Sequence, residues 1–508
     1  MADAAARPRP AIAPLAAPHR GAATALLQRL IPCWPLLAGL LFFARLLAAR
    51  RALLNDPDTY LHVAAGRWML AHAALPLHDP FSHSMPGALW ICSEWLAEIA
   101  LAASYRLCGW NGVVILAAGC AAAALALLAH FLLRRLPPLP ALIATAAAAE
   151  LLEPHVLARP HILALPLLVL WSGWLLAARD AARGPPFAAL PVMALWSNLH
   201  ASFLFGLALA AFLGGEAVLQ PAQTRGAEAV RWGGFVAAAI LAALLTPLGP
   251  ATLVQPFRLM LMPSLQSGFG EWLSPNFQQS PDLELWILGI VFVGFATGLR
   301  LPPTRLVLLL GLMHEMLQHV RHADLLAIVG PLAIAAPLGR RLGELTPSSP
   351  SRLAAWCDRL ARPASLPAGA LALVVAAALA APAALRPLAR GDDAATPAAA
   401  LAAAQSIGLT GPVLNSEAFG GYLLFRGVPD FIDGRIELYG NAFLAADLAA
   451  ERGDRTALAG LLRRYHIAWT LLQRHSAEAL AMRDIAGWRR VYADDRAIVY
   501  RRADGAPR

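Results

Sequence analysis

Apolar residues run through this chain in long stretches, and polar residues gather in the turns between them. A membrane-crossing helix needs about 20 apolar residues, with about 17 as the lower bound, and several stretches are shorter than that. The pattern predicts a polytopic α-helical membrane protein with approximate helix boundaries. The candidate crossings cover residues 31–49, 112–133, 141–157, 162–178, 187–199, 201–219, 232–246, 284–299, 306–318, 323–338 and 367–385.

Arginine clusters predict the orientation of these crossings. Two apolar segments lie between each adjacent pair of clusters, and basic loops stay on the cytoplasmic side of a membrane. With residues 1–30 disordered in the cytoplasm, the count is about eleven crossings and the C-terminus lies outside. The clusters are Arg134/Arg135, Arg179/Arg183, Arg225/Arg231, Arg300/Arg305 and Arg340/Arg341/Arg352/Arg359/Arg362.

One stretch decides whether the number of membrane crossings is odd or even. Residues 90–133 must cross only once, and their first part, which ends near Trp110, carries Glu94, Glu98 and an arginine. Such a segment favours a helix on the membrane surface over a span. We therefore expect a transmembrane domain at 31–390 whose first outer loop, 50–110, contains surface helices.

The composition changes near Gly391 to Gly, Asp, Arg, Tyr and short β-rich runs. Residues 391–508 are predicted to form a soluble periplasmic α/β domain, since about 100 residues can bury their own core. Helical periodicity fills 442–465, and Asp494-Asp495 indicates a hairpin turn. The candidate strands are 412–415, 430–432, 467–472, 489–492 and 497–501.

Composition and charge agree with a membrane protein. The 508 residues are 58% hydrophobic and 14% charged, against about 25% charged residues in soluble domains. Arginine supplies the whole basic charge, because the chain has no lysine, and no nucleic-acid motif accompanies the net charge of +9. The five cysteines form no CxxC or Cys/His pattern, so neither a zinc site nor a disulfide framework is implied.

Asp56 and Asp58 are the most informative candidate residues, because they directly follow the first apolar segment. Ionisable groups at membrane depth mark functional sites by default. One interpretation is a solvated Asx-Pro turn that ends a helix. The other is a general base that takes a proton from an acceptor hydroxyl. His62 lies in the amphipathic segment that follows, 60–73, which is predicted to hold the two acids at the membrane surface.

Short motifs continue along the first outer loop and the later turns. This succession resembles GT-C-type membrane glycosyltransferases, most of all the bacterial relatives of protein O-mannosyltransferases and aminoarabinose transferases. The motifs are Asp58-Thr59-Tyr60-Leu61-His62, Gly66-Arg67-Trp68-Met69-Leu70, Asp79-Pro80-Phe81-Ser82, Glu94-Trp95-Leu96, Arg159-Pro160, Asn198-Leu199-His200 and Glu271-Trp272.

The resemblance implies a GT-C fold and a catalytic Asp just after the first span. Asp58 matches that position, and Asp56 is the neighbour that could substitute. The second acidic position of the better-known families has no clear Asp here, and Glu153 is the nearest candidate. Some of these families use a divalent cation and others do not, so the need for a metal stays open.

The remaining site candidates gather on the predicted outer face. Arginine matches phosphate oxygens with a forked set of donors, so Arg321, Arg159 and Arg258 are candidates for the phosphate of a lipid-linked donor. The alternative for a lone arginine is snorkelling to lipid head groups. Asn198 and His200 are either satisfied interfacial residues or ligands of sugar hydroxyls, and Glu94 is a candidate substrate contact.

Four further features favour structural interpretations. Asp79 is expected to cap a turn, Glu98 to face water, and Asp433 to pair with Arg435. Three histidines near the predicted outer end of residues 306–338 are spaced irregularly for one helix face, which disfavours a metal site. These histidines are His314, His319 and His322.

Together with the resemblance, these observations predict a glycosyltransferase of the bacterial inner membrane. It is expected to move a sugar from a polyprenyl-phosphate donor to a glycan, lipid or protein acceptor at the outer face, in contact with membrane lipid and not with nucleic acid. The alternatives are a transporter or flippase for a lipid-linked glycan and a non-catalytic assembly factor. A transporter predicts intramembrane charges in both halves and helices broken at matching places.

Overall fold

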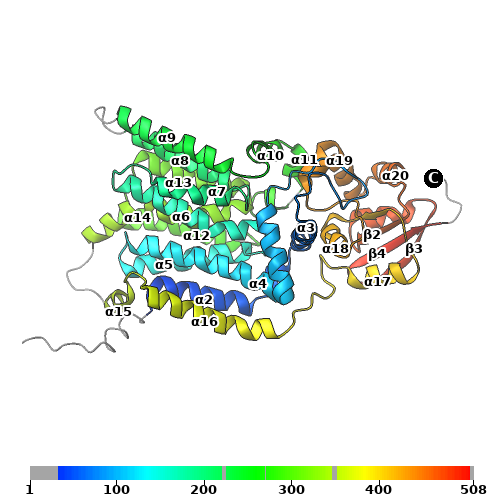
Figure 1. The fold of residues 1–508 in the computed structure, drawn as a ribbon, viewed down its shortest axis with the longest axis horizontal. Coiled ribbons are helices and arrows are strands. Elements are labelled where there is room, and N and C mark those ends of the chain that lie inside the picture. Colours follow the sequence, from blue (N-terminus) through cyan, green and yellow to red (C-terminus); the bar gives the residue numbers. More distant parts are fainter. Residues whose placement is uncertain (1–31, 220–224, 269, 346–351, 504–508) are drawn as a thin grey trace, which may run out of the picture.

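The computed structural model describes residues 32–219, 225–268, 270–345 and 352–503, and within them the chain is mostly helical with one small sheet near the C-terminus (Figure 1). The expectation of a disordered N-terminal segment at 1–30 lies outside the described residues.

Among the described residues, five helical segments are long and apolar enough to cross a membrane. They account for the membrane character that the hydropathy pattern predicts. They are α4 (Trp95–Leu133), α6 (Pro160–Asp180), α9 (Arg225–Ala243), η5 with α14 (Val320–Leu345), and α16 (Leu366–Leu385).

Shorter helices occupy the other predicted crossings and run alongside the long ones in Figure 1. Proline stands in the first turn of several of them, where its missing N–H leaves no intrahelical bond unmade. Since α7 has only seven residues, the count of about eleven crossings stays a prediction. These helices are α2 (Trp34–Ala48), α5 (Pro138–Leu152), α7 (Leu190–Trp196), α8 (Phe203–Val218), α12 (Pro281–Thr297) and α13 (Pro303–Gln318).

Helix α4 bends sharply at Cys108 and Gly109, where Gly109 has a φ of 58° that favours glycine. The bend brings the backbone of Gly112 against the carbonyl of Ser104, so a methyl group on Gly112 would collide with it. In Figure 1 the first half of α4 crosses the ends of the bundle helices, beside α3 (Asp58–His72). This break agrees with the expectation that residues 95–110 form a helix of their own.

The C-terminal sheet has four strands in the order β1-β2-β4-β3. β1 (Val413–Asn415) is parallel to β2 (Trp469–Gln473), and β4 (Ala497–Arg502) is antiparallel to both β2 and β3 (Trp488–Ala493). The predicted hairpin at Asp494-Asp495 is therefore confirmed. The predicted strand at 430–432 is wrong, because these residues form a loop fixed by side-chain hydrogen bonds.

Helices surround this sheet and connect it to the bundle. Residues 442–465, predicted as one helical run, form two helices separated by a turn at 452–454. The helices of this part are α17 (Ala398–Ser406), α18 (Glu417–Phe425), α19 (Ile436–Glu451), α20 (Arg455–Arg464) and α21 (Ala477–Ala481). The short helices between α9 and α12 are α10 (Ala251–Met260), α11 (Pro263–Gly268) and η4 (Gly270–Trp272).

Candidate functional site

Asp56 and Asp58 stand at the start of α3. An Asp56 carboxylate oxygen accepts a hydrogen bond of 2.8 Å from the Asp58 N–H, so the predicted Asx turn is present. The turn is not solvated, because the Asp56 side chain is only 7% exposed. The geometry of the turn directs the Asp58 carboxylate at Arg159, the residue that immediately precedes α6 (Pro160–Asp180).

Arg159 is the centre of the cluster. It immediately precedes α6 in an extended conformation, and its guanidinium lies 3.0 Å from Asp56 Oδ2 and 3.0 Å from Asp58 Oδ2. It also forms an ion pair with Glu271 of η4. A carboxylate oxygen of Glu271 lies 3.8 Å from Arg321, whose guanidinium stacks 4.7 Å from the ring centre of Trp272. The sequence-predicted residues Asp56, Asp58, Arg159 and Arg321 thus belong to one connected network.

The charges of this network set the protonation of its carboxyl groups. Burial raises the pKa of Asp58 to about 6, since the Asp56 charge adds to the effect of burial while Arg159 opposes both. Burial also acts to raise the pKa of Glu271, but Arg159 and Arg321 outweigh it and hold that pKa below its usual range. Near neutral pH, Asp58 and Glu271 therefore both face the guanidiniums as carboxylates.

Glu94 and His200 form a second layer beside this network. His200 Nε2 lies 3.4 Å from Glu94 Oε1, and the His200 ring is 6.0 Å from that of His161. Burial raises the pKa of Glu94 to about 7. Burial and nearby cationic side chains lower the pKa of His200 well below its usual value, so His200 is neutral at pH 7. Both groups can exchange hydrogen bonds with a polar ligand without adding full charges.

His62 lies one helical turn after Asp58 and pairs with Glu98 across 3.1 Å. The second carboxylate oxygen of Glu98 accepts a hydrogen bond of 2.8 Å from the Cys92 thiol. The Glu98 side chain is 4% exposed, so the expectation that it faces water is wrong. Glu98 is buried because α3 packs against α4, a tertiary contact that the helix pattern of residues 95–110 does not reveal.

Three predicted ligand residues take other positions. Asn198 uses its side chain within the fold: it accepts from the Trp95 indole at 2.9 Å and donates to two backbone carbonyls. Glu153 pairs with Arg45 of α2 instead of lying in the Asp58 network. Arg258 is exposed on α10 and, among the described residues, forms no ion pair with these carboxylates.

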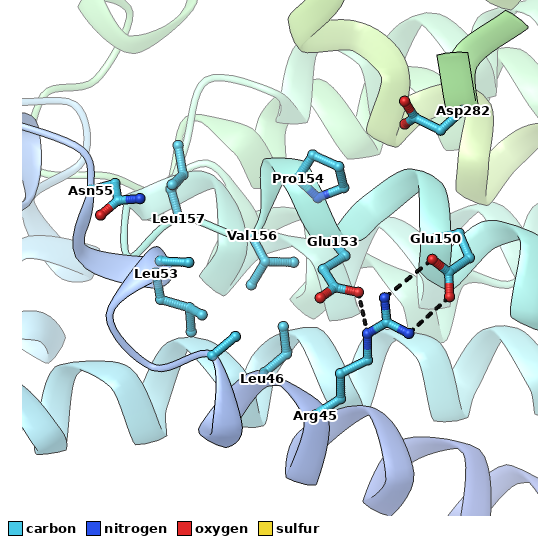
Figure 2. A pocket seen from close by; sticks show the side chains of 12 residues that line it. Arg45, Leu46, Leu53, Asn55, Glu150, Glu153, Pro154, Val156, Leu157 and Asp282 are labelled. Carbon is cyan, nitrogen blue, oxygen red and sulfur yellow. Dashed lines mark hydrogen bonds and ion pairs between the residues drawn. The ribbon is translucent and has the colours of Figure 1, made fainter. Parts of the chain in front are cut away.

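A groove of about 490 Å³ begins beside Asp56, at its neighbour Asn55, and runs between α2 and α5. Figure 2 shows Arg45 in this groove, bonded to both Glu150 and Glu153. Its apolar lining can accept hydrocarbon next to the carboxylate network. That lining comprises Leu46, Ala49, Ala52, Leu53, Pro154, Val156 and Leu157.

The C-terminal domain closes the other side of Asp58. A methyl group on Gly434 would collide with the Asp58 carboxylate, and one on Gly421 of α18 would press on the carbonyl of Pro57. The backbone of this domain therefore forms a wall of the site. Glu417, at the start of α18, interacts electrostatically with Asp58. Burial and then the Asp58 charge raise the pKa of Glu417 well above its usual value.

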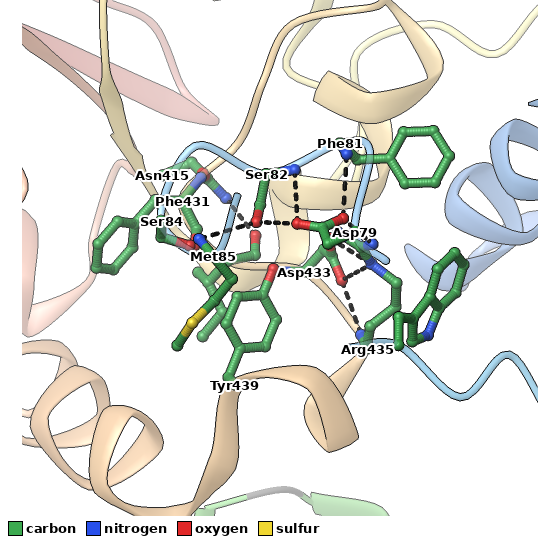
Figure 3. A network of polar contacts seen from close by, with 12 residues as sticks. Asp79, Phe81, Ser82, Ser84, Met85, Asn415, Phe431, Asp433, Arg435 and Tyr439 are labelled. Carbon is green, nitrogen blue, oxygen red and sulfur yellow. Dashed lines mark hydrogen bonds and ion pairs between the residues drawn. The ribbon is translucent and has the colours of Figure 1, made fainter. Parts of the chain in front are cut away.

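A buried network holds that wall in place (Figure 3). Arg435 bridges Asp433, at 2.6 Å, and Asp79 of the first outer loop, at 2.5 Å. Asp79 also accepts from the N–H groups of Phe81 and Ser82, which confirms its predicted turn. The Asp433–Arg435 pair is confirmed as well. Through Arg435 it fixes Gly434 relative to the first outer loop.

Within the described parts of the chain, no group of three or more His, Cys, Asp or Glu side chains is arranged to hold a metal ion. The three histidines near η5 serve other contacts where the structure shows them. His319 Nδ1 lies 2.7 Å from the Trp272 carbonyl, and His322 pairs with Glu315 at 3.2 Å.

Some members of the site escape prediction from the sequence. Glu271, His161, Glu98 and Gly434 belong to the network or its walls, yet none of them is a predicted site residue, although each lies in or beside a segment that the sequence singles out. Each reaches the site through a contact between distant segments.

No protein-family model matches the chain, and no curated protein is significantly similar to it.

Proposed function

We propose that this protein is a membrane glycosyltransferase of the GT-C type. It transfers a sugar from a polyprenyl-phosphate donor to an acceptor at the outer face of a bacterial inner membrane. In the same proposal the chain crosses the membrane about eleven times and carries residues 391–508 in the periplasm. The short helices that flank the five long ones support this count.

The observation that carries the proposal is the pairing of Asp58 with Arg159 at 3.0 Å. A general base works best with a pKa near the operating pH, and burial raises the pKa of Asp58 to about 6. The arginines supply positive charge where a phosphate leaving group develops negative charge. Base and counter-charge therefore lie within one cluster.

In the proposed reaction, the acceptor oxygen attacks the anomeric carbon of the donor sugar. The new C–O bond forms while the bond from that carbon to the phosphate oxygen breaks. The acceptor proton passes to the Asp58 carboxylate, and the electron pair of the broken bond leaves on polyprenyl phosphate. Holding donor and acceptor together supplies the proximity contribution.

Glu271 occupies the position where we place the donor phosphate. Its carboxylate bridges Arg159 and Arg321, and at 43% exposure it is the most exposed member of the network. A phosphate that displaces Glu271 gains both guanidiniums. The apolar part of the groove that starts at Asn55 suits the attached polyprenyl chain.

Envelope glycans of a deletion strain test this function. Complementation with the wild-type gene should restore a glycan species seen by mass spectrometry, and Asp58→Asn at equal protein level should not. A flippase or an assembly factor needs no base at this position. Equal restoration by both genes would contradict transfer by this site.

A further inference from the structure

A second cavity, of about 410 Å³, lies between α3 and the first half of α4. Its lining is Arg67, Leu70, Ala71, Ala102, Tyr105 and Arg106. None of these residues belongs to the Asp58 network. Arg67 follows Asp58 by nine residues, which at 3.6 residues per turn is about half a turn around the helix axis. The cavity therefore opens on the opposite face of α3 from the proposed active site.

Hydrogen-bond donors converge on this cavity without an acceptor. Among the described residues, neither Arg67 nor Arg106 forms an ion pair, and the Tyr105 hydroxyl forms no hydrogen bond. The Arg67 guanidinium lies 5.3 Å from the ring centre of Phe425, and the Tyr105 ring packs 5.5 Å from the same ring. These contacts order the side chains of Arg67 and Tyr105 at the rim, and the exposed Arg106 adds a second positive charge to the lining of the cavity.

Exposed leucines flank the arginines. Leu70, one turn after Arg67, is 43% exposed, and Leu107, the neighbour of Arg106, is 81% exposed. Arginine beside exposed leucine is typical of helices that lie in a membrane interface. Both helices lie where the bundle ends and the C-terminal domain begins (Figure 1), which is the head-group level in the predicted topology.

We propose that this cavity binds the phosphate of an anionic phospholipid head group from the surrounding bilayer. Arg67 and Arg106 contact the phosphate oxygens as forked donors, and Tyr105 adds a hydroxyl donor. Leu70 and Leu107 contact the acyl chains. A soluble phosphate ligand gives these leucines no role, so we assign the site to a lipid. The assignment is independent of glycosyl transfer.

Native mass spectrometry of the purified full-length protein tests the site. Phosphatidylglycerol and phosphatidylcholine are added in turn, and the dissociation constant of each is read from the bound fraction. Basic side chains near a membrane surface each attract anionic lipid measurably. We expect phosphatidylglycerol to bind more tightly, and the double variant Arg67→Gln/Arg106→Gln to weaken it about tenfold or more.

The matched control is Arg489→Gln/Arg490→Gln, which removes two exposed arginines of β3 and should leave lipid binding unchanged. Three results would overturn the site. These are equal affinity for the two lipids, unchanged affinity in the Arg67/Arg106 variant, or an equal loss in the control. Displacement of the lipid by millimolar inorganic phosphate would overturn the lipid assignment.

Discussion

Asp58 is a carboxyl group whose environment suits it to give and take a proton. Burial favours its neutral form, and the guanidinium of Arg159 at 3.0 Å favours its charged form. The balance places its pKa at about 6, where the group can be a base at neutral pH and still accept a proton. Asp56 forms an ion pair with the same arginine, and its side chain accepts the hydrogen bond that forms the turn and orients Asp58.

The pH dependence of activity follows from this balance. The base form of Asp58 is the carboxylate, which predominates above pH 6, so activity is lost as the pH falls through the raised pKa. We expect kcat/KM for transfer to drop about tenfold for each unit below pH 6 and to level off above it. A profile that keeps its plateau down to about pH 4 would place the essential base elsewhere.

The bridging position of Glu271 leads to a second expectation at this scale. Glu271→Gln removes the charge that competes with donor phosphate for Arg159 and Arg321. We expect the KM for the lipid-linked donor to fall about tenfold in steady-state assays. Glu344→Gln is the control and should leave KM unchanged, because Glu344 is an exposed carboxylate that, among the described residues, pairs with Arg341 alone. A raised KM in Glu271→Gln would show that Glu271 binds substrate.

At the level of elements, the site is assembled from segments that are remote in sequence. The start of α3, the residue before α6, η4, η5 and the loop after α18 each contribute one wall or one charge. The buried Arg435 network ties the last of these to the first outer loop. The C-terminal domain is therefore part of the site and not an appendage.

Gly434 tests that conclusion. In Gly434→Ala the new methyl group meets the Asp58 carboxylate and must displace it. A misplacement of about 1 Å costs about 100-fold in rate, so we expect a loss of that order in kcat. Gly391→Ala, where a methyl group meets open space, should keep wild-type kcat. Full activity of Gly434→Ala with an unchanged melting temperature would separate the domain from catalysis.

Local pattern explains what the sequence could and could not predict. Apolar runs predicted the helices, and Asp494-Asp495 predicted the β3–β4 hairpin, because neighbours in the chain decide both. Residues 430–432 form a loop where the sequence predicts a strand, because the hydrogen bonds that fix this loop come from Asn415. Contacts of Glu98 with His62 and of Gly434 with Asp58 depend on tertiary packing, which no local pattern encodes.

At the scale of the whole molecule, the proposed function requires one orientation of the chain in the membrane. The helical bundle, the crossing first half of α4 and the C-terminal domain follow one another along the molecule (Figure 1). Asp58 lies between bundle and domain, so the site and residues 391–503 lie at the same end of the bundle. The proposed function requires that end to be outside the cytoplasm.

Reporter fusions measure that orientation. Alkaline phosphatase becomes an active enzyme only outside the cytoplasm, whereas arginine-rich loops of membrane proteins stay inside. We expect high phosphatase activity when the enzyme is fused after Arg508, and low activity when it is fused to a chain truncated after Leu345. The reverse pattern would place Asp58 in the cytoplasm.

The release of polyprenyl phosphate is the sharpest test of the proposed sugar transfer, because this product forms whatever the sugar is. Purified protein in nanodiscs is supplied with a membrane extract from cells that lack it, and polyprenyl phosphate is quantified by mass spectrometry. We expect release by the wild type and a rate lower by about 100-fold or more in Asp58→Asn. Equal release by the two proteins, or none by the wild type, would contradict it.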